Sequence, residues 1–141
     1  MRISSLLLAS MLVFSFDASA SRPCETNYSK SGTLLKGRQF STWAVIPGAS
    51  PADVFRRLQS EGVKSGLRVA HADAASGILN FEQTVPHRTS TVTLPWNIVV
   101  ESEGDGSKVT VSKSTPATYM TSESSHQSSM CSVIESAQPR S

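Results

Sequence analysis

The chain has 141 residues, of which 13 are lysine or arginine and 11 are aspartate or glutamate, giving a formal net charge of +2. This length fits one domain. The basic residues are spread along the chain and only 6% of the residues are aromatic. A nucleic-acid-binding face needs massed lysine and arginine, or aromatic rings that stack on bases. We therefore expect no nucleic-acid partner.

The N-terminal segment has the three parts of a secretory signal peptide. Arg2 is its basic residue, LLLASMLVFSF (6–16) is an apolar run, and Ala18 and Ala20 form an A-x-A cleavage site. A membrane span needs about 20 apolar residues, and this run is shorter and ends at Asp17. We expect cleavage of residues 1–20, a periplasmic or secreted mature protein, and no later membrane span.

Cys24 and Cys131 are the two cysteines of the chain. Lipidation of Cys24 is not expected, because Arg22 and Pro23 precede it and the lipoprotein signal peptidase cuts after a small residue. Export leads to an oxidising compartment, where an even number of cysteines predicts disulfides. We predict a bond between Cys24 and Cys131. Two free thiols, or pairing between chains, are the alternatives that the sequence leaves open.

The first predicted elements are an arm, a strand and a helix. Residues 21–37 are polar without any period and predict an N-terminal arm tied down by the disulfide. Residues 38–48 alternate and carry apolar side chains on both sides, which predicts a strand. A helix should follow, because Ser50 suits its N-cap, Pro51 its first position and Gly62 its end.

Strands fill the middle of the chain. Residues 66–85 predict a β-hairpin, and residues 89–101 alternate cleanly as a half-buried antiparallel strand. Pro95 cannot donate a hydrogen bond within a sheet, so it predicts a sheet edge or a bulge there. EGDG (103–106) predicts a turn, and residues 107–114 the last strand.

A terminal helix is predicted over residues 126–137, with residues 138–141 as a tail. The resulting order is β-α-β-β-β-β-α. Because successive strands are joined as hairpins, we expect one α+β domain over residues 38–137, an antiparallel sheet with helices packed on one face.

Residues 36–137 resemble small bacterial envelope domains such as those of the outer-membrane assembly lipoprotein BamC. The likeness lies in a strand and helix followed by a hairpin that turns at Asp73, Gly77 and Ile78, and in the SKVTVS strand before the final helix. This chain lacks the lipobox of BamC. LPWNIVVESEGDG is also similar to the domain-of-unknown-function 302 family, whose FGNP-type turn is missing here. These resemblances imply an envelope protein and provide no catalytic residue.

His71, Asp73 and His87 are the candidate residues of a polar site. His71 and Asp73 are two residues apart on a strand and so share a face. They could form an acid–base pair or half of a metal site, or simply a polar pair at the rim of a hairpin. His71, His87 and His126 do not have the spacing of zinc ligands, and the chain has no G-x-S-x-G or phosphate-binding motif. We expect no catalytic residue, metal or cofactor.

Trp43 and Trp96 lie on alternating strands, which predicts core positions, although either ring could also stack on a sugar or peptide. The favoured function is a non-enzymatic binding or interaction module with an envelope protein or peptide as partner. The alternatives are an inhibitor or immunity-type protein that acts on an enzyme, and a small hydrolase with an unrecognised site. An enzyme should have a concave pocket with converging polar groups, whereas an interaction module should have an apolar patch or an open strand edge.

Overall fold

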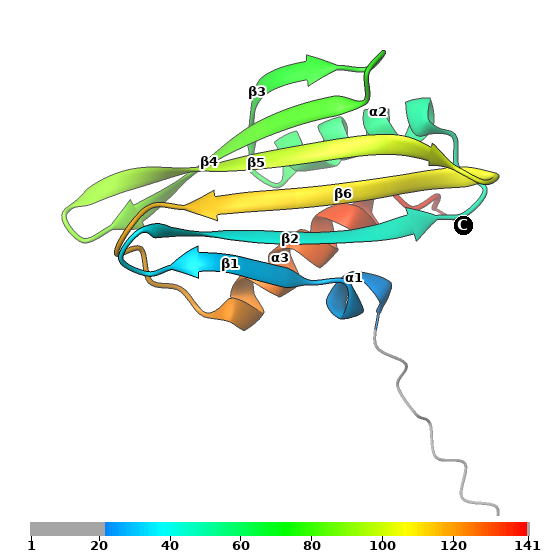
Figure 1. Cartoon of the computed structure of the whole chain (residues 1–141). Helices are drawn as coiled ribbons and strands as arrows, with labels where there is room; N and C mark the ends of the chain where they lie inside the picture. Colours follow the sequence, from blue (N-terminus) through cyan, green and yellow to red (C-terminus); the bar gives the residue numbers. More distant parts are fainter. Residues whose placement is uncertain (1–21, 141) are drawn as a thin grey trace, which may run out of the picture.

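A six-stranded antiparallel sheet runs through the computed structural model, which describes residues 22–140, and its strands lie in the order β1-β2-β6-β5-β4-β3 (Figure 1). The strands are β1 (Ser29–Thr33), β2 (Gly37–Ile46), β3 (Arg68–Asp73), β4 (Ile78–His87), β5 (Ser90–Glu103) and β6 (Gly106–Thr115). The helices are α1 (Pro23–Thr26), α2 (Pro51–Lys64) and α3 (Glu123–Ser136). The predicted signal peptide, residues 1–20, and the last residue of the predicted tail lie outside the described residues.

The α+β class and the antiparallel sheet are as predicted, but the predicted order lacked two elements. Residues predicted as a polar arm form α1 and β1. All five residues of β1 are exposed, so the strand has no hydrophobic period. It forms because its backbone pairs with β2, from Ser29 opposite Ser41 to Thr33 opposite Gly37. Backbone hydrogen bonding of this kind leaves no trace in the side-chain pattern.

The two long helices, α2 and α3, contact each other and lie on the same side of the sheet in Figure 1. The start of α2 is as predicted, because the Ser50 hydroxyl accepts a hydrogen bond from the Asp53 N–H at 3.3 Å. Its end is not, since the helix continues past Gly62 to Lys64. Gly62 lies inside the helix, where a Cβ atom would come within 2.3 Å of the Phe81 ring. The glycine serves close packing and not helix termination.

The core lies between the sheet and the two long helices. Its largest fully buried side chains are Trp96, Phe40, Phe81, Ile46, Leu58, Leu79, Leu94, Ile98, Met130, Ile134, His126 and Val54. Trp96 is in the core as predicted, but Trp43 is 39% exposed. Trp43 alternates with the buried Thr42 and Ala44, so it points to the other face of the sheet, which no described helix covers.

Pro95 lies next to the point at which β5 stops pairing with β6. The prediction of an edge is wrong for β5 as a whole, because β5 lies between β6 and β4. Pairing with β6 begins only at Trp96, opposite Lys113, whereas pairing with β4 continues through Pro95, opposite Glu82. Pro95 therefore sits just beyond the end of the β5–β6 ladder, where a residue without an N–H is tolerated.

Within residues 22–140, none of the helices is both long and apolar enough to cross a membrane.

Candidate functional site

The structure does not bring the three predicted polar-site residues together. His71 is exposed on the edge strand β3, and Asp73 ends that strand. The Asp73 carboxylate accepts hydrogen bonds from the Ser76 hydroxyl at 2.6 Å and from the Ser76 N–H at 3.2 Å. The hydroxyl bond, more than any other contact, lowers the pKa of Asp73. The carboxylate thus closes the β3–β4 turn, which makes its role structural.

His87 lies at the opposite end of β4 from this turn. The strand runs from Ile78 to His87, which at about 3.3 Å per residue separates its ends by roughly 30 Å. His87 packs against the Tyr119 ring, with 5.6 Å between ring centroids. Among residues 22–140, no three or more histidine, cysteine, aspartate or glutamate side chains are grouped so that they could hold a metal ion.

A cavity of about 310 Å³ opens between α2 and α3 above the sheet, and we call it the helix pocket. It is lined by Glu61, Gly62, Ser65, Leu67, Gln83, Trp96, Ser129, Ser132, Val133 and Ser136. These residues come from both long helices, from strands β4 and β5, and from the segment after α2. Sequence reasoning missed the pocket because its residues are dispersed. The one available signal was the spacing of Ser129, Ser132 and Ser136, which places them on one face of a helix.

Trp96 gives the helix pocket an apolar surface. The residue is 2% exposed, and its indole N–H donates a hydrogen bond to Gln83 Oε1 at 3.1 Å. The polar atom of the ring is therefore satisfied within the protein. Leu67 and Val133 add apolar surface to the lining.

The α3 wall of the pocket carries three serines whose hydroxyl groups already donate hydrogen bonds within the helix. Each hydroxyl donates to a backbone carbonyl one turn earlier in the helix, as serines in helices commonly do. Ser129, Ser132 and Ser136 donate to the carbonyl oxygens of His126, Ser128 and Val133 at 2.9, 2.9 and 2.6 Å. The oxygen atoms keep lone pairs that can accept hydrogen bonds from a ligand.

Of the residues that the structure describes, Glu61 is the one carboxylate in the pocket lining. It accepts hydrogen bonds from Lys64 at 2.9 Å and from Arg140 at 3.2 Å. The hydrogen bond from Lys64 is the largest cause that lowers the pKa of Glu61. The Glu61 carboxylate is therefore ionised at neutral pH. Because its oxygens already accept from Lys64 and Arg140, it is a poor candidate for a general base.

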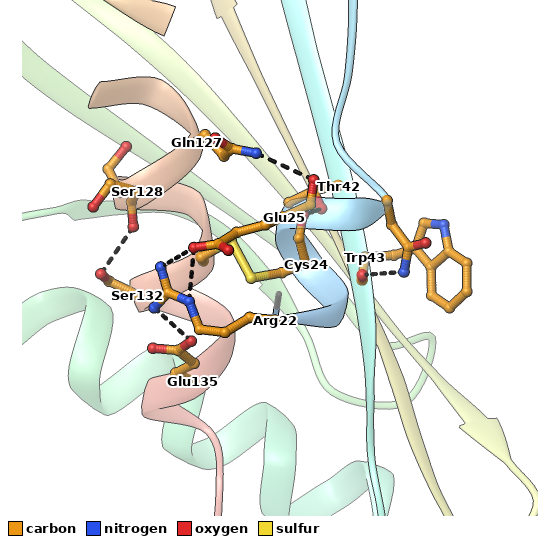
Figure 2. Close-up of a disulfide and its surroundings, with 12 residues drawn as sticks. Arg22, Cys24, Glu25, Thr42, Trp43, Gln127, Ser128, Ser132 and Glu135 are labelled. Carbon is orange, nitrogen blue, oxygen red and sulfur yellow. Dashed lines mark hydrogen bonds and ion pairs between the residues drawn. A yellow bond between two sulfur atoms is a disulfide. The ribbon is translucent and has the colours of Figure 1, made fainter. Parts of the chain in front are cut away.

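The structure contains the predicted bond between Cys24 and Cys131, which joins α1 to α3 with 5.6 Å between the two Cα atoms (Figure 2). The Gln127 side chain donates to the backbone carbonyl of Glu25 at 3.1 Å. The Cys24 carbonyl accepts a hydrogen bond from the buried Thr42 hydroxyl of β2. The disulfide thus lies in a junction that ties α1 to both the sheet and α3.

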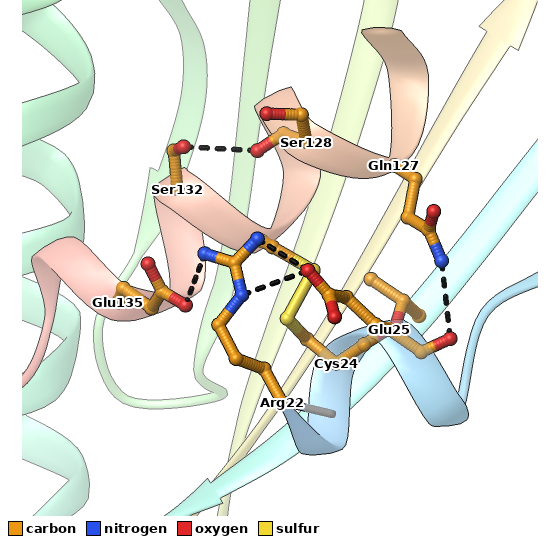
Figure 3. Close-up of polar contacts among 9 residues, drawn as sticks. Arg22, Cys24, Glu25, Gln127, Ser128, Ser132 and Glu135 are labelled. Carbon is orange, nitrogen blue, oxygen red and sulfur yellow. Dashed lines mark hydrogen bonds and ion pairs between the residues drawn. A yellow bond between two sulfur atoms is a disulfide. The ribbon is translucent and has the colours of Figure 1, made fainter. Parts of the chain in front are cut away.

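Arg22 extends this junction along α3. Its guanidinium donates to Glu25 at 2.9 Å and to Glu135 at 2.8 Å, which links the two helices beside the disulfide (Figure 3). Ser132, a pocket residue labelled in Figure 3, follows Cys131 directly in the sequence. Because Cys131 is followed so closely by pocket residues, the junction fixes the position of the α3 wall.

The serines on the α3 wall of the helix pocket are not arranged as nucleophiles. A serine nucleophile needs a hydrogen-bonded base, and each of the three serines on the α3 wall instead donates to a backbone carbonyl. Among residues 22–140, no histidine lines the pocket. It combines an aromatic floor, aliphatic side chains and a few polar groups, which is typical of small-molecule sites.

No protein-family model matches the chain, and no curated protein matches it. Among solved structures, Ara h 8.0201 is similar with a TM-score of 0.50 and 11% sequence identity, over 70% of this chain and 93% of that chain. A conserved protein of unknown function from Enterococcus faecalis has a TM-score of 0.49 and 10% identity, over 81% of this chain and 75% of that one. CalU16 from Micromonospora echinospora has a TM-score of 0.45 and 11% identity, over 77% of this chain and 81% of that one.

At these identities the likeness concerns the fold alone. It shows that another protein, Ara h 8.0201, arranges its chain in a similar way.

Proposed function

We propose that this chain is an exported, non-enzymatic binding protein that holds a small ligand in the helix pocket. The observation that carries the proposal is the pocket of about 310 Å³ between α2 and α3, with Trp96 and a row of serines in its lining. Pockets that bind small molecules have volumes of roughly 300 Å³ or more and place a few polar groups around an apolar lining. The helix pocket meets both conditions.

Export is the second part of the proposal. The apolar segment at residues 6–16, followed by Ala18 and Ala20, is typical of a signal peptide. The disulfide between Cys24 and Cys131 is compatible with an oxidising compartment. The resemblance to envelope domains of the BamC type points in the same direction, and a periplasmic or secreted location is therefore part of the proposal.

The proposal narrows the partner expected from the sequence, an envelope protein or peptide, to a small molecule. The strand edges β1 and β3 remain accessible for pairing with another chain, but β1 has only five residues, and short edge strands are a common protection against such pairing. The hydrolase alternative is less well supported, because the three serines on the α3 wall donate to backbone carbonyls and not to a base.

The test is a fluorescence titration of the mature protein with phenylnaphthylamine, an uncharged apolar dye. The expected result is saturable binding that Ser129→Phe abolishes, because the added ring fills the pocket. Ser128→Phe is the matched control, since Ser128 is the preceding residue of α3, is exposed and does not line the pocket. Binding that survives Ser129→Phe, or that both variants remove equally, would contradict the pocket as the binding site.

A further inference from the structure

Three loops lie together at one end of the sheet, and we call them the three-loop end. They are the β1–β2 turn, the β4–β5 turn and the linker from β6 to α3, residues 34–36, 88–89 and 116–122. All three lie at the left of Figure 1. The Thr118 N–H donates to the Leu34 carbonyl at 2.8 Å, and the Tyr119 ring packs against His87. These contacts make the three loops one surface.

The two most exposed large apolar side chains of residues 22–140 belong to this end. Leu35, in the β1–β2 turn, is 81% exposed, and Met120, in the linker, is 76% exposed. Leu34, another exposed apolar side chain, lies beside them. Apolar side chains scattered singly over a surface need no explanation, whereas a group of them indicates contact with a protein or a membrane.

The three-loop end is also cationic. Its loops include Lys36 and Arg88 and contain no aspartate or glutamate. Both residues are exposed, and within residues 22–140 neither of them forms an ion pair. Glu123, which follows the linker, is paired with Lys30 at 2.6 Å. The end therefore presents positive charge beside its apolar side chains.

The opposite end of the sheet carries the opposite charge. Strand β5 runs from the three-loop end to the β5–β6 turn, where residues 101–107 contain three carboxylates and no lysine or arginine. The strand has 14 residues, which at about 3.3 Å per residue separates its two ends by roughly 40 Å. Charge separated in this way orients the molecule near an anionic surface with the three-loop end foremost.

The backbone of this end adopts unusual conformations. Within residues 22–140, the two non-glycine residues with a positive φ are Arg88 at 54° and Thr118 at 63°, and both belong to the three-loop end. For a β-branched residue such as threonine this conformation is strained, and such strain concentrates at functional sites. Arg38 donates to the Tyr119 carbonyl at 3.2 Å and adds a second bond that holds the linker. The exposed side chains therefore project from a preorganised support.

We propose that the three-loop end binds the surface of a membrane that contains anionic lipids. Leu35 and Met120 enter the boundary between headgroups and acyl chains, while Lys36 and Arg88 stay at the level of the lipid phosphates. The helix pocket is lined by other described residues, so this inference is independent of the proposed function.

An acidic protein is the other partner that this positive charge suits. A stable protein interface covers about 800 Å² on each partner and has aromatic residues in its packed centre. The three-loop end consists of short loops, and its most exposed apolar side chains are the aliphatic Leu35 and Met120. A fluid lipid surface accepts side chains that project from separate loops without needing a complementary pocket. The observations therefore favour a membrane.

The experiment is sedimentation of the mature protein with vesicles of phosphatidylcholine, alone or mixed in equal parts with phosphatidylglycerol. We expect binding to the mixed vesicles, little binding to phosphatidylcholine alone, and weaker binding as the salt concentration rises. Leu35→Ser should weaken binding to the mixed vesicles by about ten-fold, because a polar side chain gains nothing by leaving water. Lys36→Gln should weaken this binding by about five-fold through the loss of one charge near the lipid surface.

The matched controls make the same changes elsewhere on the surface. Val63→Ser replaces an exposed apolar residue of α2, and Lys108→Gln removes a cation of β6 that forms no ion pair within residues 22–140. Neither control should weaken vesicle binding. The thermal midpoint of Leu35→Ser should equal that of the parent, because the side chain is exposed. Should Leu35→Ser not fold, Met120→Ser supplies the same comparison.

Three results would overturn the inference. If the protein does not sediment with the mixed vesicles, or sediments equally with phosphatidylcholine alone, an anionic membrane is not its partner. If either control weakens binding as much as its counterpart does, binding does not take place at the three-loop end. If Leu35→Ser and Met120→Ser both retain full binding while Lys36→Gln loses it, the end recognises negative charge alone, as an acidic protein supplies, and the membrane inference is wrong.

Discussion

His126 is 1% exposed and stacked on Phe40, and neither of its ring nitrogens has a hydrogen-bond partner within residues 22–140. Burial is the main cause that lowers the pKa of His126 to about 4, and the nearby charges of Lys113 and Arg38 lower it further. The neutral form is therefore present in the folded protein at neutral pH. In the unfolded chain the same imidazole has an ordinary pKa and takes up a proton more readily.

This difference predicts a loss of stability in acid. The folded-state pKa is depressed, so the contribution is fully present above pH 6.5 and is lost as the pH falls towards about 4. A shift of this size corresponds to about 3 kcal/mol of unfolding free energy. We expect the parent to lose about this much relative to His126→Phe over that range, measured by urea unfolding at several pH values. Parallel pH profiles for the two proteins would show that His126 titrates normally.

At the scale of elements, close packing of α2 on β4 depends on a residue without a side chain. Gly62 faces the Phe81 ring, and a Cβ atom would approach that ring to 2.3 Å. In an exposed helix, replacing glycine by alanine stabilises by about 1 kcal/mol. At Gly62 the steric clash with Phe81 should make the same replacement destabilising.

We expect Gly62→Ala to destabilise the protein by about 1–3 kcal/mol, the range found for overpacked cores. Phe81→Leu alone should also destabilise, since it removes a buried ring. The double variant should be more stable than the sum of the two single effects predicts, because the smaller side chain leaves room for the methyl group. Urea unfolding of the four proteins measures the coupling, and strict additivity would contradict the contact.

For the molecule as a whole, the disulfide joins residues 107 positions apart and so constrains nearly all of the described chain. It fixes α1 against α3, and Arg22 and Gln127 add polar contacts at the same junction. In the chain-entropy account, closing a loop of about 100 residues contributes about 4–5 kcal/mol. The pocket wall on α3 depends on this constraint.

We expect the Cys24→Ala, Cys131→Ala double variant to lose about 2–5 kcal/mol of unfolding free energy and to bind phenylnaphthylamine more weakly, because α3 is less firmly held. The control is Arg22→Gln, which removes the exposed ion pairs with Glu25 and Glu135 and should have a much smaller effect. Calorimetry of oxidised and reduced parent protein gives a second measurement. Equal midpoints in the two redox states would contradict the prediction.

Much of the fold was accessible from local sequence signals. The cap at Ser50, the turn at 73–77 and the alternation in residues 89–101 each reflect interactions between residues close in the chain, and the corresponding elements α2, the β3–β4 turn and β5 are present. β1 was missed because it is held by backbone pairing alone, and the role of Gly62 was missed because Phe81 approaches it from another strand.

The sequence by itself determined the α+β class and the antiparallel hairpins, because periodicity and turn residues are local properties. The number of cysteines predicted the pairing of Cys24 with Cys131, and the structure contains that bond. Only the tertiary structure decided the site. Trp96, Ser129 and Glu61 belong to three different elements, and no spacing between them signals that they line one pocket. Their proximity results from the docking of α2 and α3 over the sheet. This docking is set by burial of side chains that are distant in the chain.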